Sequence, residues 1–158
     1  LFDLGETLVT EQGDLFYLLP ETLEMVDALH ALGIPIGIIT NVLPSWDEDY
    51  LRTLLAEPEL LDEFDLVLLS SDAEAPKPDP AIYTLAHDLL PGAPEIERTA
   101  YVTEEIGDIA DALSNPTEGA RAVGMIGVLV SDVDLPLADY RVDSLASIPS
   151  APWLTCSR

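Results

Sequence analysis

Several polar side chains follow apolar runs of strand length, at the positions where such strands would end. They are Asp3, Thr40, Asn41, Ser70, Ser71 and Glu104. Lys77, the sole lysine, lies in a proline-rich segment between two of these runs. The carboxyl ends of parallel strands meet at one edge of a sheet. Carboxylates and an ammonium group gathered there can hold a magnesium ion and a phosphoryl group, and a carboxylate can attack the phosphorus.

Simple structural roles are the alternative for the same residues. Threonine and serine are common in turns, and acids such as Glu104 and Glu105 are common in the first turn of a helix. We favour this structural explanation for Ser70 and Ser71. For Asp3 and Lys77 we favour a role in chemistry.

Apolar runs alternate with amphipathic segments along the chain, which predicts an α/β fold with a doubly wound parallel sheet. The predicted strands are an opening strand that ends at Asp3, then 34–40, 66–69, 99–103, 125–130 and a short edge strand at 140–142. The predicted helices are 20–32, 46–56, one that starts at Pro80, 109–113 and 117–123.

Local signals place several boundaries. Pro20 suits the first turn of a helix and Gly33 the position after its end. Ser45 is the predicted N-cap of the second helix, and Asp79 with Pro80 behind it is the predicted start of the helix after the lysine. Residues 9–14 are predicted to form a polar loop and 15–19 an apolar approach to the first helix.

The composition predicts one domain over residues 1–158, long enough to bury a core. Six basic residues against thirty acidic ones give a formal net charge of −24. Such a charge repels nucleic acid phosphates and anionic lipids, so we exclude both nucleic acid and membrane as partners. The excess of acids predicts a solvated acidic surface, or in a sharper form an adaptation to high salt.

The cellular setting is predicted from cysteine content and hydropathy. Cys156 is the only cysteine, which fits a reducing cytoplasm. The longest apolar stretches, such as 31–40, are too short to span a bilayer, and no signal peptide pattern opens the chain. The missing initiator methionine suggests that the first strand has been trimmed. Nothing in the composition specifies an oligomeric state.

Four segments resemble motifs of the haloacid dehalogenase superfamily of hydrolases. FDLGETL at 2–8 resembles the first motif, a strand that ends in Asp-x-Asp-x-Thr, and GIITN at 37–41 resembles the second. KPDPAIY at 77–83 resembles the third closely, and YVTE at 101–104 with GARAVGM at 119–125 resembles the fourth. The resemblance covers nearly the whole chain. It implies a Rossmannoid parallel sheet in three αβα layers, a magnesium ion and an aspartyl-phosphate intermediate.

The resemblance also implies roles for the residues that match. Asp3 would be the nucleophile, Thr40 would hydrogen-bond the phosphoryl group, and Asn41 would bind substrate. Lys77 would stabilise the negative charge on the nucleophile and the phosphate.

The same resemblance implies a magnesium site made of oxygen ligands. The ligands would be Asp3, the backbone carbonyl of Gly5, Glu104 and Asp108.

The chain departs from the family pattern in three ways. Gly5 replaces the second aspartate of the first motif, the usual general acid and base, whose proton transfer is typically worth ~10²–10⁴-fold in rate. The Gly-Asp of the fourth motif is Thr103-Glu104. The segment between Thr7 and Pro20 is too short for a cap domain, and so is the segment before Lys77. Halide displacement, which relies on a closed, cap-lined pocket, is therefore not expected.

Two functions from different classes remain. The first is a magnesium-dependent phosphatase-like hydrolase, slow for want of an acid at position 5, acting on a small phosphorylated substrate or a phosphoprotein. The alternative is a catalytically weakened domain that binds a phosphorylated ligand or a protein partner. We favour the hydrolase because Asp3, Thr40 and Lys77 are all retained.

Overall fold

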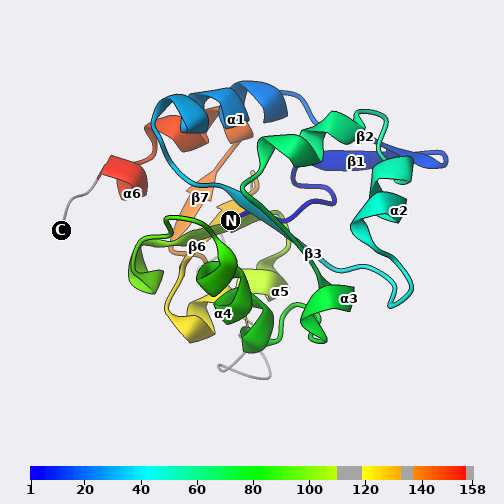
Figure 1. Ribbon diagram of the computed structural model, residues 1–158. Coiled ribbons are helices and arrows are strands. Elements are labelled where there is room, and N and C mark those ends of the chain that lie inside the picture. Colours follow the sequence, from blue (N-terminus) through cyan, green and yellow to red (C-terminus); the bar gives the residue numbers. More distant parts are fainter. Residues whose placement is uncertain (110–118, 133–136, 156–158) are drawn as a thin grey trace.

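A parallel sheet runs between two layers of helices in the computed structural model (Figure 1), which describes residues 1–109, 119–132 and 137–155. The named strands of this sheet are β3 (Gly37–Thr40), β4 (Leu66–Leu69), β5 (Ala100–Thr103), β6 (Ile126–Val130) and β7 (Tyr140–Val142). β3 pairs with β4, and β6 pairs with β5 on one side and β7 on the other; every pair is parallel.

The opening segment joins these two groups of strands. Phe2 forms parallel bridges to Ile38 of β3 and to Val102 of β5. Its amide donates to Gly37 and its carbonyl accepts from Ile39, each at 2.8 Å. The order is therefore β4, β3, opening segment, β5, β6, β7, which is wound outward in both directions from the start of the chain. The predicted α/β class and parallel sheet are confirmed.

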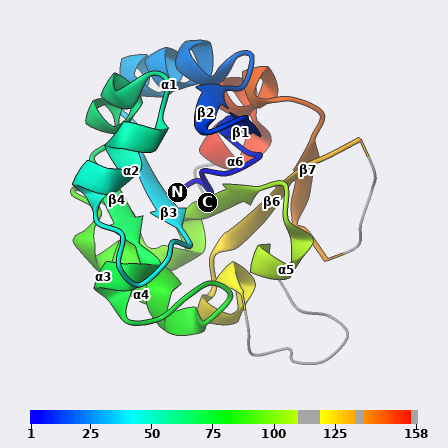
Figure 2. The same cartoon turned by 90° about the vertical axis from the view of Figure 1, so that its right-hand side faces the viewer.

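Helices cover both faces of the sheet, and Figures 1 and 2 show α1 and α4 on opposite sides of the strands. The α-helices are α1 (Thr22–Ala31), α2 (Glu48–Leu54), α3 (Ser70–Ala73), α4 (Pro80–Leu89), α5 (Ile106–Ile109) and α6 (Pro152–Thr155). Shorter 3₁₀ helices lie at Pro58–Glu63, Ile96–Arg98, Ala120–Val123 and Leu145–Ser150. No helix among these described residues is long and apolar enough to cross a membrane.

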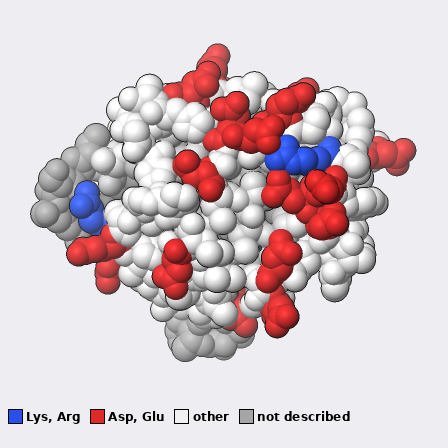
Figure 3. Space-filling view, viewed as in Figure 1, with Lys and Arg blue, Asp and Glu red and all other residues white. Residues whose placement is uncertain are grey.

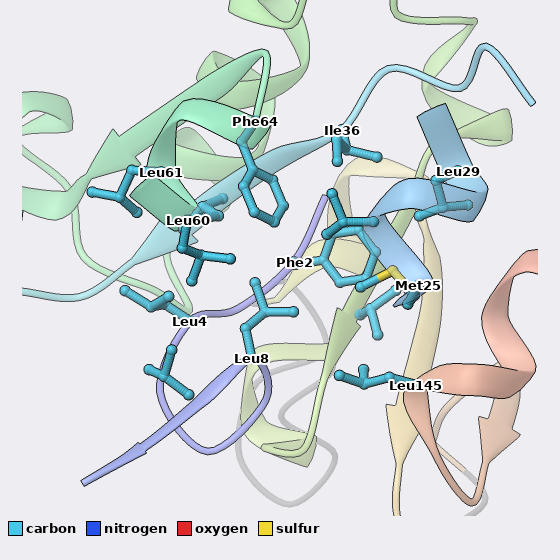
Figure 4. Close-up of a cluster of buried hydrophobic side chains, with 14 of the residues drawn as sticks. Phe2, Leu4, Leu8, Met25, Leu29, Ile36, Leu60, Leu61, Phe64 and Leu145 are labelled. Atoms are coloured by element: carbon cyan, nitrogen blue, oxygen red, sulfur yellow. The ribbon is translucent and has the colours of Figure 1, made fainter. Parts of the chain in front are cut away.

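Two apolar cores lie on the two faces of the sheet. Successive residues of a strand point to opposite faces, so Ile38 joins the core under α1 while Ile39 joins the core under α4. Phe2 belongs to the first core, among Met25 and Leu29 (Figure 4). Burial of a side chain of this size stabilises the fold by about 1.5–3 kcal/mol. The opening segment is therefore held by packing as well as by its hydrogen bonds.

A β-hairpin follows the opening segment, where we predicted a polar loop. Strand β1 (Val9–Gln12) pairs antiparallel with β2 (Leu15–Leu18), and Gln12 lies opposite Leu15. The two-residue turn contains Gly13 at φ 70°, a conformation that glycine adopts without strain. The loop prediction for 9–14 is therefore wrong. The hairpin takes up residues 9–18 of the short connection between Asp3 and α1, which leaves no room for a cap domain at this position.

Helix boundaries show which local signals were decisive. Asp79 caps α4 by accepting a hydrogen bond from the amide of Ala81 at 2.9 Å, as predicted. Ser45 does not cap α2; Asp47 accepts from the Tyr50 amide at 2.8 Å instead. Helix α1 begins at Thr22, two residues after Pro20.

The two helices predicted after β5 are only partly covered by the described residues. Helix α5 is described over Ile106–Ile109, and the predicted helix 109–113 falls, after its first residue, on residues 110–118, which lie outside the described chain. The predicted helix 117–123 is a 3₁₀ helix over Ala120–Val123, and Gly124 at φ 93° ends it as expected.

Candidate active site

An open pocket of about 290 Å³ lies at the carboxyl edge of the sheet. Its lining residues are Asp3, Gly5, Thr40, Asn41, Lys77, Glu104, Glu105 and Asp108. The structure thus brings together every residue that the sequence predicts for catalysis, substrate binding and metal binding. Ser70 and Ser71 lie elsewhere: Ser70 hydrogen-bonds the backbone of Val42, and Ser71 that of Trp46.

Asp3 lies at the base of this pocket, directly after the central segment of the sheet. Its Oδ1 accepts from the Lys77 ammonium at 2.6 Å and from the Leu4 amide at 2.7 Å. Among the described residues, its Oδ2 has only a long contact of 3.4 Å, with the Thr103 hydroxyl. Burial raises the pKa of Asp3, and Lys77 offsets this only in part. One carboxylate oxygen is thus fully engaged, while the other is nearly free to react.

The Lys77 side chain is buried, and its ammonium makes hydrogen bonds to Asp3 and Tyr101 and an ion pair with Asp108. Its ammonium lies 2.6 Å from Asp3 Oδ1, 2.7 Å from Asp108 Oδ2 and 2.9 Å from the Tyr101 hydroxyl. The Asn41 side chain holds the lysine backbone, because its Nδ2 donates to the Lys77 carbonyl at 3.0 Å and its Oδ1 accepts from the Lys77 amide at 2.8 Å. Asn41 thus positions the loop that carries Lys77. Its predicted contact with substrate stays a prediction.

Tyr101 completes this buried network and is a residue that the sequence analysis missed. Its hydroxyl donates to Asp108 Oδ2 at 3.1 Å. Burial, followed by the charges of Asp3 and Asp108, raises the pKa of Tyr101 well above its ordinary value. A signal was present, because a tyrosine in a strand buried on both faces must find a partner for its hydroxyl.

Glu104 forms the opposite, exposed wall of the pocket. Its amide donates to the Thr7 hydroxyl at 3.1 Å, which ties the turn after β5 to the turn after Asp3. Partial burial raises the pKa of Glu104, and the carboxylates of Glu105, Asp3, Glu6 and Asp108 add to this effect. The pocket mouth therefore has an excess of negative charge that favours a cation.

Comparison with known proteins assigns the chain to a family. The family model for hydrolases of the haloacid dehalogenase-like type matches residues 1–112. This chain belongs to the haloacid dehalogenase-like hydrolases. The matched range contains all the predicted site residues, which are Asp3, Gly5, Thr40, Asn41, Lys77, Glu104 and Asp108.

Individual relatives agree with this assignment. The bovine (Bos taurus) haloacid dehalogenase-like hydrolase domain-containing protein 3 is 32% identical over 124 residues, which are 78% of this chain and 43% of that protein. The HAD phosphatase from Thermococcus onnurineus has a TM-score of 0.65 at 24% identity, over 84% of this chain and 57% of that one. The L-2-haloacid dehalogenase from Xanthobacter autotrophicus has a TM-score of 0.65 at 20% identity, over 87% of this chain and 61% of that one.

The coverage and the identity of these relatives limit what they show. The chain spans less than two thirds of each of the three relatives. At under 25% identity, the two solved structures show a shared fold, and one is a phosphatase while the other is a dehalogenase. Membership in the family therefore establishes a haloacid dehalogenase-like hydrolase with a Rossmannoid core, and leaves its reaction open to proposal.

The oxygen groups of the pocket fit magnesium in kind. Asp3, Glu104 and Asp108 supply carboxylates and Gly5 a backbone carbonyl, and magnesium prefers oxygen ligands. In the described part of the chain no three His, Cys, Asp or Glu side chains group closely enough to form a metal site by themselves. The Asp108 carboxylate is already paired with Lys77. Asp3, Glu104 and the Gly5 carbonyl are thus the donors left to face the pocket.

Gly5 has room for a side chain. A Cβ at this position would meet no atom within 4 Å, and the backbone is not in the left-handed region. The neighbouring Glu6, at φ 53°, is the residue that makes the left-handed turn. The fold would therefore accept an aspartate at position 5, and the backbone does not require a glycine there.

Proposed function

We propose that this domain hydrolyses phosphate monoesters through a covalent intermediate on Asp3, with magnesium as cofactor and a small phosphorylated compound or a phosphoprotein as substrate. One observation carries the proposal. Asp3 is held at the base of an open pocket, with Oδ1 bonded to Lys77 and Oδ2 nearly unbonded. A carboxylate in this setting is suited to nucleophilic attack.

The chemistry divides between attack and hydrolysis. Asp3 Oδ2 attacks the phosphorus and the ester P–O bond breaks, so the leaving oxygen departs with the bonding electron pair and takes a proton from water. A water molecule then attacks the phosphorus of the aspartyl phosphate and gives a proton to solvent. The bond between Asp3 Oδ2 and phosphorus breaks, which releases inorganic phosphate and restores the carboxylate. The Lys77 ammonium remains beside Oδ1 and offsets the negative charge that gathers at Asp3.

The leaving alcohol needs a proton, and Gly5 has none to give. The rate should therefore depend steeply on the acidity of the leaving group. An aryl phosphate, whose leaving group needs little protonation, should be a much better substrate than an alkyl or sugar phosphate. This preference is the kinetic signature that distinguishes the site from one with an acid at position 5.

The charge of the pocket explains why a cation is needed. Four carboxylates (Asp3, Glu104, Glu105 and Asp108) against the one ammonium of Lys77 leave a net charge of −3 around the lining. A phosphate dianion would be repelled from such a surface. Magnesium held by Asp3, the Gly5 carbonyl and Glu104 would supply the missing positive charge at the phosphoryl oxygens.

The alternative is a domain that binds phosphorylated ligands or a protein partner without turnover. Gly5 and the Thr103-Glu104 pair favour it, because each departs from the pattern of an efficient hydrolase. The experiment is a panel of aryl and alkyl phosphates, assayed with and without magnesium, with Asp3→Asn as the blank. Magnesium-dependent release of phosphate, fastest from aryl esters, supports the hydrolase. Calorimetric binding of phosphate esters without any release by the wild type supports the alternative.

A further inference from the structure

The Lys77 ammonium meets three acceptors, and one of them is a neutral hydroxyl. We propose that Tyr101 is a positioning residue that orients the Lys77 ammonium against Asp3, acting jointly with Asp108. The inference deepens the proposed function, since it rests on Asp3 and Lys77 acting together.

The Lys77 ammonium is held by three contacts. A lysine ammonium has three N–H donors on a flexible stem. In this structure the three acceptors are Asp3 Oδ1 at 2.6 Å, Asp108 Oδ2 at 2.7 Å and the Tyr101 hydroxyl at 2.9 Å. Two of these contacts are hydrogen bonds, to Asp3 and Tyr101, and the third is an ion pair with Asp108, so three contacts determine the position of the nitrogen. Without Tyr101, only the two carboxylates would hold it.

The surroundings of Tyr101 show why its hydroxyl is present. The side chain is fully buried, and its ring packs edge-on against Tyr83 at 5.1 Å between centroids. A phenylalanine could make the same ring contact. A buried hydroxyl costs free energy unless it is hydrogen-bonded, and within the described chain this one is bonded only to Lys77 and Asp108. The hydroxyl of Tyr101 is therefore explained by its hydrogen bonds to Lys77 and Asp108, which a phenylalanine could not make.

The direction of the two hydrogen bonds supports the same role. Tyr101 accepts from Lys77 and donates to Asp108, so it can hold both charged partners at once. The second tyrosine, Tyr83, donates to the backbone carbonyl of Asp108 at 2.9 Å and has no bond to Lys77. Tyr83→Phe is therefore a matched control: it removes a buried tyrosine hydroxyl from the same ring pair and leaves the contacts of the lysine in place.

The chain offers a direct reporter, because Lys77 is its only lysine. Reductive methylation followed by peptide mass spectrometry measures the modification rate of that one side chain and separates it from the terminal amine. In folded Tyr101→Phe, we expect Lys77 to be methylated roughly 10-fold faster than in the wild type, since a hydrogen bond to a charged group is lost. In Tyr83→Phe the rate should stay near that of the wild type.

Kinetics supply the second readout. With an aryl phosphate, Tyr101→Phe should lower kcat by about 10-fold or more and leave KM nearly unchanged, because a displaced ammonium weakens the reacting geometry and not the initial contact. Equal methylation rates in the two variants, or equal kcat values, would overturn the positioning role of Tyr101. If the wild type hydrolyses no phosphate ester, the proposed function fails, but the methylation rates still decide whether Tyr101 positions Lys77.

Discussion

In the part of the chain that the structure describes, two cations each bridge two carboxylates. Lys77 joins Asp3 and Asp108 at 2.6 and 2.7 Å in the base of the pocket. Arg52 joins Glu48 and Asp62 at 2.7 and 2.8 Å on the surface, and its guanidinium also donates to the Pro58 carbonyl. The bond lengths are nearly the same. The settings differ: the Lys77 side chain is 4% exposed and the Arg52 side chain 27%.

Burial changes what the same geometry does. At the surface, hydrogen bonds to Glu48 and then to Asp62 raise the pKa of Arg52, so the charged form is favoured. In the pocket, burial raises the pKa of Asp3 more than Lys77 lowers it, so the charged form is disfavoured. A buried pair is weak evidence for stability, because desolvation offsets its attraction. The Lys77 cluster is therefore best explained by chemistry, and the Arg52 cluster by local order around α2.

Removing each cation gives the largest expected contrast. Lys77→Ala should abolish phosphate ester hydrolysis and should destabilise the fold by about 3–5 kcal/mol, because two buried carboxylates lose their counter-charge. Arg52→Ala, the matched control, should lower the free energy of unfolding by about 0–1 kcal/mol and leave activity unchanged. Urea unfolding and the aryl phosphate assay measure both. Lys77→Met, which keeps an apolar stem, separates the loss of charge from the loss of packing.

Full activity in a folded Lys77 variant would show that the buried cluster is structural after all. An equal loss of stability in both variants would show that burial does not distinguish the clusters.

An acidic side chain at position 5 should supply the general acid that the Lys77 cluster lacks. Gly5→Asp should raise turnover of alkyl phosphates, by up to ~10²–10⁴-fold if the carboxyl group reaches the leaving oxygen. The site tolerates the change, since the new side chain meets open space and the backbone is not left-handed. Gly5→Asn, of the same size but unable to give a proton in this way, is the control. An equal gain in both variants, or no gain in a folded Gly5→Asp protein, would argue against the missing general acid as the limit on rate.

The pH dependence of turnover should report the buried carboxylate. Only ionised Asp3 can attack, and its pKa is raised above 3.8, so the acid limb of the rate profile should lie above that value. The effect of pH on stability has the opposite sign, because ionised Asp3 is needed for turnover but is disfavoured in the fold. The protonated form is favoured in the fold, so the contribution of Asp3 to stability is lost as the pH rises through its raised pKa. Asp3→Asn should therefore gain stability relative to the wild type between pH 3.8 and neutrality, measured by urea unfolding. A difference that does not change with pH would contradict the burial argument.

Salt should change the stability contribution of the surface charges more than that of the buried Lys77 cluster. This change should be the smallest of the predicted effects. The acids seen across one face in Figure 3 belong to a chain of net charge −24. Raising KCl from ~0.1 to ~1 M shortens the screening length from ~10 to ~3 Å. The melting temperature of the wild type should rise, and the small deficit of Arg52→Ala should shrink. The deficit of Lys77→Ala should persist, because its partners are buried. A melting temperature that is unchanged or lower at high salt would contradict self-repulsion at the surface.

Much of the fold was predictable because its signals are local. The run 66–69, the edge strand 140–142 and the Asp79-Pro80 helix start agree with the structure in full, since apolar runs and caps act over a few residues. The hairpin had a signal too: Gly13-Asp14 separates two segments rich in strand-forming residues. The polar residues of segment 9–14 favoured a loop, which is why the turn was not predicted.

The site was predictable as a set of residues but not as a network. Strand ends and motifs bring Asp3, Lys77 and Asp108 to one edge. No local pattern predicts that Asp108 pairs with Lys77 or that Asn41 clamps the lysine backbone. These contacts join segments more than thirty residues apart, and they depend on how α4 and its loop pack on the sheet.

The central claim is that Asp3 becomes phosphorylated. The wild type would be mixed with an aryl phosphate and magnesium, quenched in acid during turnover, and digested for peptide mass spectrometry. We expect a phosphoryl group on the peptide that contains Asp3, and none in Asp3→Asn. Steady hydrolysis with no phosphoryl group on that peptide, or with the group on another residue, would contradict the account.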